Sequence, residues 1–260
     1  MFRVLCALLL FLSLSINAFI TTKSPFRCMK SLKSDSNVEI DALIDNIKKS
    51  TPQNAVIVIK YGGHAMENEE FKNLFCEDIA TLCRIGIRPV IVHGGGPQIA
   101  ATLKKLEIES KFIQGLRVTD AKTMEVAQMV LCGSINKDLA GKISGLDGVR
   151  GAIGLSGLDG KLIKAKKIVK YAKNEQGIDE KIDLGLVGDP TGVNTGILKD
   201  LLALSLVPII APIGYNQEGG GSLNINADTA AGAGAVAEAL KADRLLLLTD
   251  VTGTSIHIYA

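Results

Sequence analysis

Two short runs of β-branched residues each end at a group of glycines, and this pattern constrains the fold more than any other feature. The first run, AVIVIKYGGH, covers residues 55–64, and the second, PVIVHGGGP, covers residues 89–97. Such a run predicts a strand buried on both faces, as in a parallel sheet covered by helices. Glycines at its carboxyl end let main-chain N–H groups approach an anion, and the following helix adds its positive end. Two such loops, the first carrying Lys60, indicate a site for two anionic ligands side by side.

Strand-like and helix-like patterns alternate along the rest of the chain. This alternation predicts an α/β fold: a three-layer sandwich with a mainly parallel central sheet and helices on both faces. The charged, loosely patterned residues 161–183 predict a hairpin that leaves the core. We expect strands at 56–59, 90–92, 152–155, 207–211 and 245–248, and helices at 38–47, 71–83, through 103–106, from 119 to 131, at 194–206 and at 229–240.

Composition and charge exclude some classes of function. A hydrophobic content of 47% in 260 residues is enough for a substantial core. Aromatic residues are only 4% and Trp is absent, so base-stacking surfaces for single-stranded nucleic acid are not expected. Residues 39–260 carry 24 basic and 26 acidic residues, a balance that argues against nucleic acid as a partner.

The first 38 residues read as a targeting segment ahead of a single domain at 39–260. Arg3 precedes the apolar run 4–14, which has the length of a signal-peptide core and is too short for a membrane anchor in the mature form. The following Ser-, Thr- and Lys-rich stretch has no acidic residue before Asp35, as in transit peptides. A signal peptide followed by a transit peptide, with Phe19 after Ala18, resembles the presequence of algae with secondary plastids. A plain secretory signal is the alternative.

Cysteine usage favours the plastid over secretion. Cys76 and Cys83 lie seven residues apart on one face of an expected helix and read as core residues. Cys132 has no partner at a metal-binding spacing. Three unpaired thiols in the mature region indicate a reducing compartment.

Six motifs in a fixed order resemble the amino-acid kinase superfamily, and within it the N-acetyl-L-glutamate kinases. They are KYGGH at 60–64, VIVHGGGPQI at 90–99, GLRVTD at 115–120, GSINKDL at 133–139, LNINADTAAG at 223–232 and LLLLTDVTG at 245–253. The resemblance implies ATP-dependent phosphorylation of the side-chain carboxylate of N-acetyl-L-glutamate, within arginine biosynthesis, with ATP and Mg²⁺. The GLRVTD and NINAD segments discriminate best, since the glycine loops are shared with kinases of other carboxylates and of carbamate.

The resemblance assigns roles to individual residues. It implies Lys60 and Asp228 as catalytic residues, with Asp228 organising the catalytic lysines. It gives N-acetylglutamate contacts to Gly95, Gly96, Arg117 and Asn224, and nucleotide contacts to Lys60, Gly62, Gly63, Thr249, Asp250 and Gly253.

The chemistry of these residue types agrees with that assignment. A glutamate carboxylate is ionised at neutral pH, so it attacks without a general base. The obstacle is charge, which lysines, backbone N–H groups and Mg²⁺ neutralise. The guanidinium of Arg117 suits a carboxylate because its planar fork donates two parallel hydrogen bonds.

Plainer interpretations stand beside these roles. Lys60 taken alone reads as a solvated residue at a strand end, and Asn224 to Asp228 as a turn followed by a helix N-cap. His64 and His93 read as loop or packing residues, because no carboxylate or Cys stands at metal spacing from either, and no metal site is expected.

The chain departs from the family pattern after Gly253, where TSIHIYA follows. We therefore expect an amino-acid kinase domain truncated at its C-terminus, lacking part of the nucleotide-binding lobe and a second catalytic lysine. Loss of such a cation weakens catalysis by roughly a hundredfold or more. Three hypotheses remain open: an acetylglutamate kinase, another carboxylate or carbamate kinase of the superfamily, and a non-catalytic subunit that binds acetylglutamate or co-assembles with a full-length kinase.

The amphipathic helix expected at 39–49 bears on assembly. Together with the KYGG spelling, it looks like the arginine-sensitive, hexameric branch found in plastids. By resemblance it links dimers into a hexamer, and arginine and the PII signalling protein are the further partners implied.

Overall fold

The computed structural model describes residues 52–62, 66–173, 179–226 and 232–248, and the side chains of 172–180 are outside this description. Its main sheet has the strand order β11-β9-β6-β10-β2-β1-β12, with β5 also paired to β10. The strands are β1 Val56–Tyr61, β2 Arg88–His93, β5 Ala152–Gly157, β6 Ile163–Lys167, β9 Val187–Val193, β10 Val207–Asn216, β11 Ser222–Ile225 and β12 Arg244–Leu248. The helices are α4 Glu69–Arg84, α5 Gly96–Lys105, α6 Ala121–Gln128, the π-helix η2 Met129–Ile135, α7 Asn136–Ser144, the short 3-10 turn η3 Asp159–Lys161, α8 Gly196–Ala203 and α9 Ala233–Leu240.

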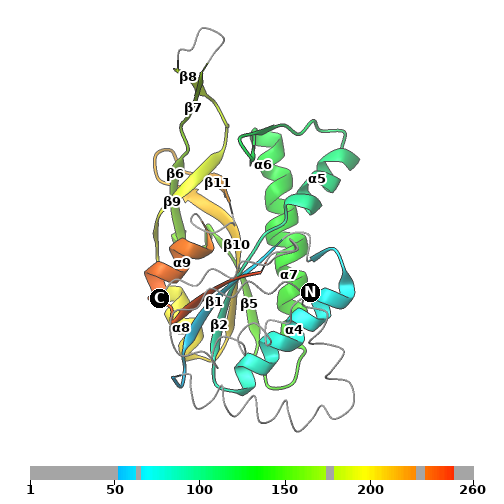
Figure 1. Ribbon diagram of the computed structural model, residues 1–260, viewed down its shortest axis with the longest axis vertical. Helices are drawn as coiled ribbons and strands as arrows, with labels where there is room; N and C mark the ends of the chain where they lie inside the picture. The colour runs from blue at the N-terminus through cyan, green and yellow to red at the C-terminus, as the bar shows by residue number, and fades with distance from the viewer. Residues whose placement is uncertain (1–51, 63–65, 174–178, 227–231, 249–260) are drawn as a thin grey trace, which may run out of the picture.

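The α/β class is as predicted, and the sheet is mixed. The strands β12, β1, β2, β10 and β5 are joined by parallel pairings, whereas β6–β9 and β10–β11 are antiparallel. Two small hairpins lie outside this sheet: β3 Phe112–Ile113 with β4 Leu116–Arg117, and β7 Lys170–Lys173 with β8 Asp179–Ile182. The second hairpin projects from one end of the molecule (Figure 1).

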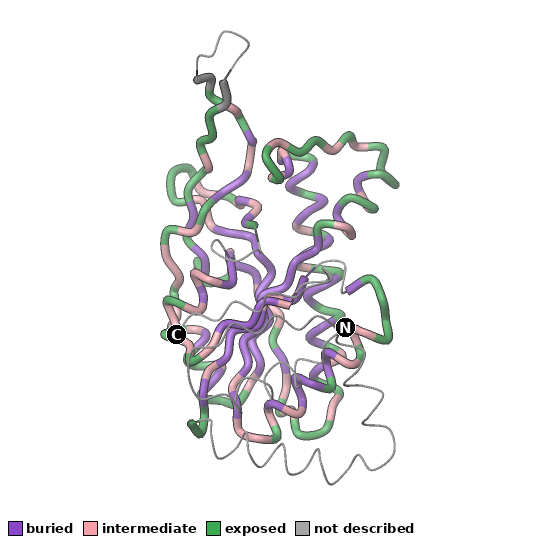
Figure 2. The backbone as a smooth tube through the Cα atoms, viewed as in Figure 1, coloured by how far each residue is buried: buried purple, intermediate pink, exposed green. Residues whose placement is uncertain are grey.

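The apolar runs alternate between two cores, one on each face of the sheet. In β1, the side chains of Ile57, Ile59 and Tyr61 join the cluster that includes α4, α6 and α7, while Val58 joins the cluster that includes α8 and α9. Figure 1 shows these two groups of helices on opposite sides of the strands, and Figure 2 shows the buried residues concentrated where the central strands run together. A strand buried on both faces is apolar at every position, which accounts for the uninterrupted β-branched run.

Helix boundaries follow local chemistry. Asn68 caps α4 by accepting a hydrogen bond from Phe71 N at 3.1 Å, and Asp120 caps α6 by accepting one from Thr123 N at 2.7 Å. The helix expected to begin at residues 119–120, with Val130 and Leu131 on its face, continues as the π-helix η2 and then as α7. None of the helices within the described ranges combines the length and apolar character that a membrane crossing requires.

The prediction of a hairpin outside the core at residues 161–183 is correct for only part of this segment. The projecting β7–β8 hairpin agrees with the predicted excursion. Ile163 and Ala165 of β6, however, are fully buried. Strand β6 pairs with β10 and β9, so this charged segment also contributes to the core.

The cysteines behave as core residues. Cys76 of α4 is buried in the hydrophobic cluster that this helix covers, and Cys83 of the same helix packs half-buried against that cluster. Burial raises the pKa of each of these thiols to about 11. Neither thiol therefore carries negative charge at neutral pH.

Candidate functional site

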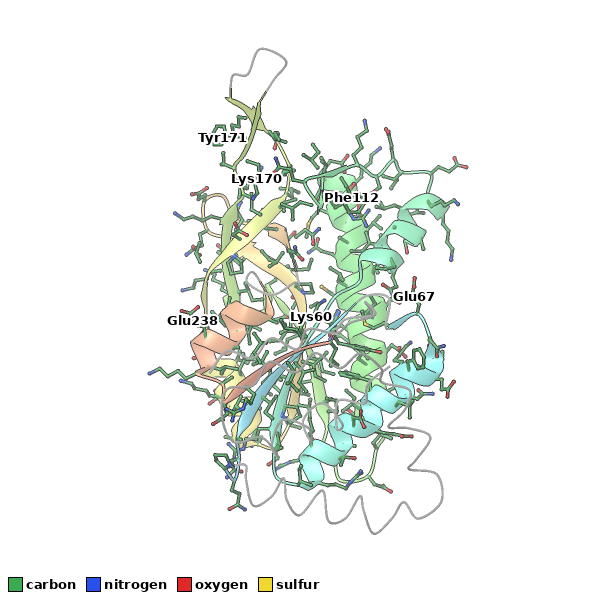
Figure 3. The ribbon with its side chains drawn as sticks, in the orientation of Figure 1. Lys60, Glu67, Phe112, Lys170, Tyr171 and Glu238 are labelled. Carbon is green, nitrogen blue, oxygen red and sulfur yellow. The ribbon has the colours of Figure 1, made fainter. Side chains whose placement is uncertain are left out.

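The two glycine loops lie side by side, as the sequence predicted. Strands β1 and β2 are parallel neighbours, with Tyr61 opposite His93 at their carboxyl ends. Beyond this pair, Gly94 N donates a hydrogen bond to Tyr61 O at 2.9 Å. Lys60 lies near the middle of the molecule, at the end of β1 (Figure 3). Parallel strands thus bring both loops to one edge of the sheet.

The loop after β1 is closely surrounded at Gly62. A Cβ added there would lie 3.0 Å from the carbonyl oxygen of Leu248 and 3.4 Å from Nζ of Lys60. The ring of Tyr61 is buried beneath the loop and stacks on Phe75 with centroids 3.9 Å apart. The Lys60 ammonium therefore lies close to the backbone at Gly62, where a larger residue would crowd the Leu248 carbonyl.

The two glycines at the start of α5 differ in their surroundings. A Cβ added to Gly95 would lie 2.6 Å from Leu131 Cδ2 and 2.6 Å from Ile135 Cδ1, both in η2. A Cβ added to Gly96 would meet nothing within 4 Å. A side chain at Gly95 would therefore displace the buried ends of Leu131 and Ile135 in the π-helix, whereas Gly96 faces open space.

Arg117 is held against the second loop. Its guanidinium donates to Gly96 O at 3.0 Å and to the hydroxyl of Ser110, and its Cζ lies 4.5 Å from the ring centroid of Phe112. The residue is only 7% exposed, and burial lowers the pKa of its guanidinium. No carboxylate pairs with Arg117 among the residues that the structure describes. A buried cation with only neutral protein partners is costly, and an anionic ligand would compensate it.

Asn224 joins this array through a residue that the sequence reasoning missed. Its Nδ2 donates to Thr119 Oγ1 over a long 3.4 Å, and the same hydroxyl donates to Arg117 O at 2.9 Å. Asn224 lies in strand β11, paired with Ile213 of β10, so the interpretation of this position as part of a turn is wrong. Thr119, which is fully buried, stands in the GLRVTD motif, and that motif was its only sequence signal.

Four of the predicted residues are thus brought together: Gly95, Gly96, Arg117 and Asn224. Lys60, near the end of β1, and Gly62, directly after this strand, lie next to them. The remaining predicted residues, which are Gly63, Asp228, Thr249, Asp250 and Gly253, lie outside the described residues, as do His64 and the helix expected at 39–49. Within the described ranges, no group of three or more His, Cys, Asp or Glu side chains has the geometry to hold a metal ion.

The reading of His93 as a packing residue agrees with its burial, but the structure adds polar contacts. The ring is fully buried at the end of β2, and burial lowers its pKa from 6.5 to about 4. Its two nitrogens contact Gly94 O and the amide of Asn136. Asn136 belongs to GSINKDL, a motif to which the sequence reasoning gave no chemical role.

Together, the fold and the site define an α/β protein with paired glycine loops and a buried arginine suited to small anionic ligands. A model described as "Amino acid kinase family" matches residues 55–254, and the chain belongs to this family.

Several curated bacterial proteins described as "Acetylglutamate kinase" are similar to the chain. The Rhodospirillum centenum protein is 51% identical over 198 residues, covering 76% of this chain and 63% of the relative. The Azorhizobium caulinodans protein is 46% identical over 231 residues, covering 86% of this chain and 75% of the relative. The chain spans 63% of the length of the Rhodospirillum centenum protein and 66% of the length of two relatives from Geotalea species.

Solved structures give the same fold. The crystal structure of smu.665 from Streptococcus mutans is 33% identical with a TM-score of 0.59, covering 75% of this chain and 73% of that one. N-acetylglutamate synthase from Neisseria gonorrhoeae, solved with coenzyme A and N-acetyl-glutamate, has a TM-score of 0.64 at 23% identity, covering 83% of this chain and 46% of that one. At that identity, the second likeness concerns the fold alone.

Proposed function

We propose that this chain catalyses ATP-dependent phosphorylation of the side-chain carboxylate of N-acetyl-L-glutamate to N-acetyl-L-glutamyl 5-phosphate, a step of arginine biosynthesis. One observation carries the proposal: Arg117 is a buried cation, hydrogen-bonded to Gly96 and Ser110, with no carboxylate partner among the described residues. The α-carboxylate of the substrate supplies the missing charge. The similarity to bacterial proteins described as acetylglutamate kinases supports this choice of carboxylate.

The substrate contacts divide between the two loops. Gly95 and Gly96 offer backbone at the start of α5, and Asn224 lies two hydrogen bonds from the main chain of Arg117 through Thr119. Lys60 and Gly62, with Gly63, hold the phosphates of ATP, and Asp228 orients the catalytic lysine. Thr249, Asp250 and Gly253 complete the nucleotide contacts.

The chemistry requires charge neutralisation rather than proton removal. The acceptor carboxylate is already ionised, so Lys60 and the loop N–H groups lower the barrier by stabilising charge on the transferred phosphoryl. Mg²⁺ enters with ATP and neutralises phosphate charge. We propose that the ATP phosphates and water supply most of the ligands of this ion.

Calorimetry with the purified full chain tests the proposal. N-acetyl-L-glutamate should bind, and Arg117→Lys should weaken binding at least ~10-fold because an ammonium lacks the bidentate fork. Arg150→Lys is the matched control: Arg150 is exposed and precedes β5, at the opposite end of the strand from the loops, so affinity should not change. Absence of binding to a folded wild-type chain would refute the substrate.

Turnover separates a kinase from a protein that only binds. Acyl phosphate formed from ATP and N-acetyl-L-glutamate is trapped with hydroxylamine and measured as the hydroxamate. Formation that depends on ATP and falls in Lys60→Ala supports the kinase. Binding without any hydroxamate would leave a non-catalytic acetylglutamate-binding subunit.

Location and assembly are proposals from the sequence alone. We propose that residues 1–38 deliver the protein to a plastid, and a fluorescent fusion that reaches the medium would show secretion instead. We also propose that residues 39–49 link dimers into a hexamer that responds to arginine and to PII. Light scattering should then show a dimer after removal of residues 1–50, and an unchanged mass would contradict this assembly.

A further inference from the structure

The imidazole of His93 is held in a single tautomer by groups that cannot exchange roles. Its Nδ1 lies 2.9 Å from Gly94 O, and a carbonyl oxygen can only accept, so Nδ1 carries the proton. Its Nε2 lies 3.1 Å from Nδ2 of Asn136 and must therefore accept.

The orientation of Asn136 is set in the same way. Its Nδ2 lies 2.9 Å from Ile209 O in β10 and 3.2 Å from Leu155 O in β5. Both oxygens accept only, so the amide nitrogen must face them, and its Oδ1 points away without a hydrogen-bond partner. Gly154 makes room for this oxygen, because a Cβ added there would lie 2.1 Å from it.

Asn136 thus links three strands at the point where β2 ends. It contacts β5 and β10 directly and β2 through His93, and it follows η2, the π-helix against which Gly95 packs. A buried, partly unsatisfied amide is expensive, so the arrangement calls for an explanation beyond packing.

The hydrogen bond to Gly94 O fixes the peptide between Gly94 and Gly95. A peptide unit is planar and trans, so its N–H points opposite its carbonyl. With the Gly94 carbonyl held by His93, the Gly95 N–H is turned away from the ring. Gly95 precedes the first residue of α5, and N–H groups at a helix start have no intrahelical acceptor. That N–H is available to a ligand.

We propose that His93 and Asn136 form a positioning pair: neutral His93, oriented by Asn136, holds the Gly94–Gly95 peptide so that the Gly95 N–H faces the bound substrate. The inference rests on the proposed function for the identity of that substrate. Neither side chain touches the substrate in this arrangement. Protonation of the ring would place an N–H against the amide N–H of Asn136, and the fully buried site also disfavours the charge.

Nuclear magnetic resonance of the full chain labelled with ¹⁵N-histidine tests the tautomer without any ligand. The His93 signals should show a protonated Nδ1 and an unprotonated Nε2 from pH 6 to pH 8, well above the pKa of the ring. A proton on Nε2 anywhere in that range would overturn the pair as described.

Two variants test the positioning role. His93→Asn places an amide near the former Nδ1 and should keep acetylglutamate affinity within ~3-fold, whereas His93→Leu should lose at least ~10-fold. Thermal unfolding must show both variants folded. Asn194→Ser is the control for loss of an amide-to-carbonyl bond. Asn194, just after β9, donates to Gly160 O of η3 at 3.1 Å, outside the candidate site, so the affinity of this variant should not change.

The outcomes separate the two proposals. No binding by the wild-type chain refutes the substrate while the tautomer measurement still decides the pair. Wild-type binding with unchanged affinity in His93→Leu, or equal loss in both His93 variants, refutes the positioning role. In turnover, a raised KM with kcat retained is expected, because a hydrogen bond kept from ground state to transition state contributes uniform binding.

Discussion

The loop after β1 is enclosed largely by the backbone of a neighbouring strand, whereas the loop after β2 is held by side chains. At the first, Gly62 is enclosed by Lys60 and by the backbone of β12. At the second, the carbonyl of Gly94 accepts a hydrogen bond from the His93 ring and the carbonyl of Gly96 accepts one from the Arg117 guanidinium, while Gly95 packs on η2. The first loop thus depends on backbone proximity and the second on side chains, so substitutions far from the second loop should reach it.

The largest expected effect concerns pH and the second loop. The pKa of His93 falls from 6.5 to about 4 on folding, so between these values the unfolded chain binds a proton that the folded chain does not. The full stability is present above pH 6.5 and is lost as pH falls toward 4. A difference of about 2.5 in pKa corresponds to about 3 kcal/mol.

Urea unfolding at several pH values checks this expectation. The free energy of unfolding should fall more steeply from pH 6.5 to 4 in the wild type than in His93→Leu, which lacks the titrating group. The variant provides the baseline for carboxylates that titrate in the same range. Parallel curves for the two proteins would show that His93 does not link folding to pH.

The next effect distinguishes the two glycines of the second loop. Gly95→Ala should lower the free energy of unfolding by about 2 kcal/mol, because Leu131 and Ile135 must move out of well-packed positions. Gly96→Ala is its matched control and should stay within about 0.5 kcal/mol, since its Cβ meets nothing. Equal stability of the two variants, measured by urea titration, would remove the distinction.

A smaller loss of stability than that of Gly95→Ala is expected in the first loop. Gly62→Ala should cost about 1 kcal/mol, because its Cβ would approach the Leu248 carbonyl at 3.0 Å. Calorimetry should show several-fold weaker binding of ATP and unchanged binding of N-acetyl-L-glutamate. Gly96→Ala should show the reverse pattern, and identical patterns in both variants would mean that the loops do not divide the ligands.

The pattern of apolar residues in the sequence predicted the elements whose residues are buried in the core. The runs that became β1, β2, β5, β10 and β12 are apolar because helices cover both faces, and the helix α4 was visible from its spaced apolar residues. The adjacency of the two glycine loops also followed, since neighbouring parallel strands end at one edge.

Features that depend on contacts between residues distant in sequence could not be predicted from local sequence patterns. Strand β11, which carries Asn224, has only four residues and gains its order from pairing with β10 and β9. The segment that forms the π-helix η2 was interpreted as ordinary α-helix. The spacing of its apolar residues does not distinguish the wider turns of a π-helix from those of an α-helix. The roles of Thr119 and Asn136 depend on carbonyl and hydroxyl partners supplied by other strands, and composition gives no sign of those partners.

The pairing of β1 with β12 has a consequence for how the chain is made. Val56 N bonds to the Asp243 carboxylate across 187 residues, and Ile57 is in register with Arg244. At ~5–20 residues per second, a ribosome needs roughly 10–40 s to supply the second partner after the first has emerged. During that interval, the edge of β1 that later pairs with β12 has no partner strand. The nascent chain therefore exposes an unpaired, aggregation-prone strand edge for much of its synthesis. Chaperone binding would matter most in this period, because it would prevent association of that edge with other chains.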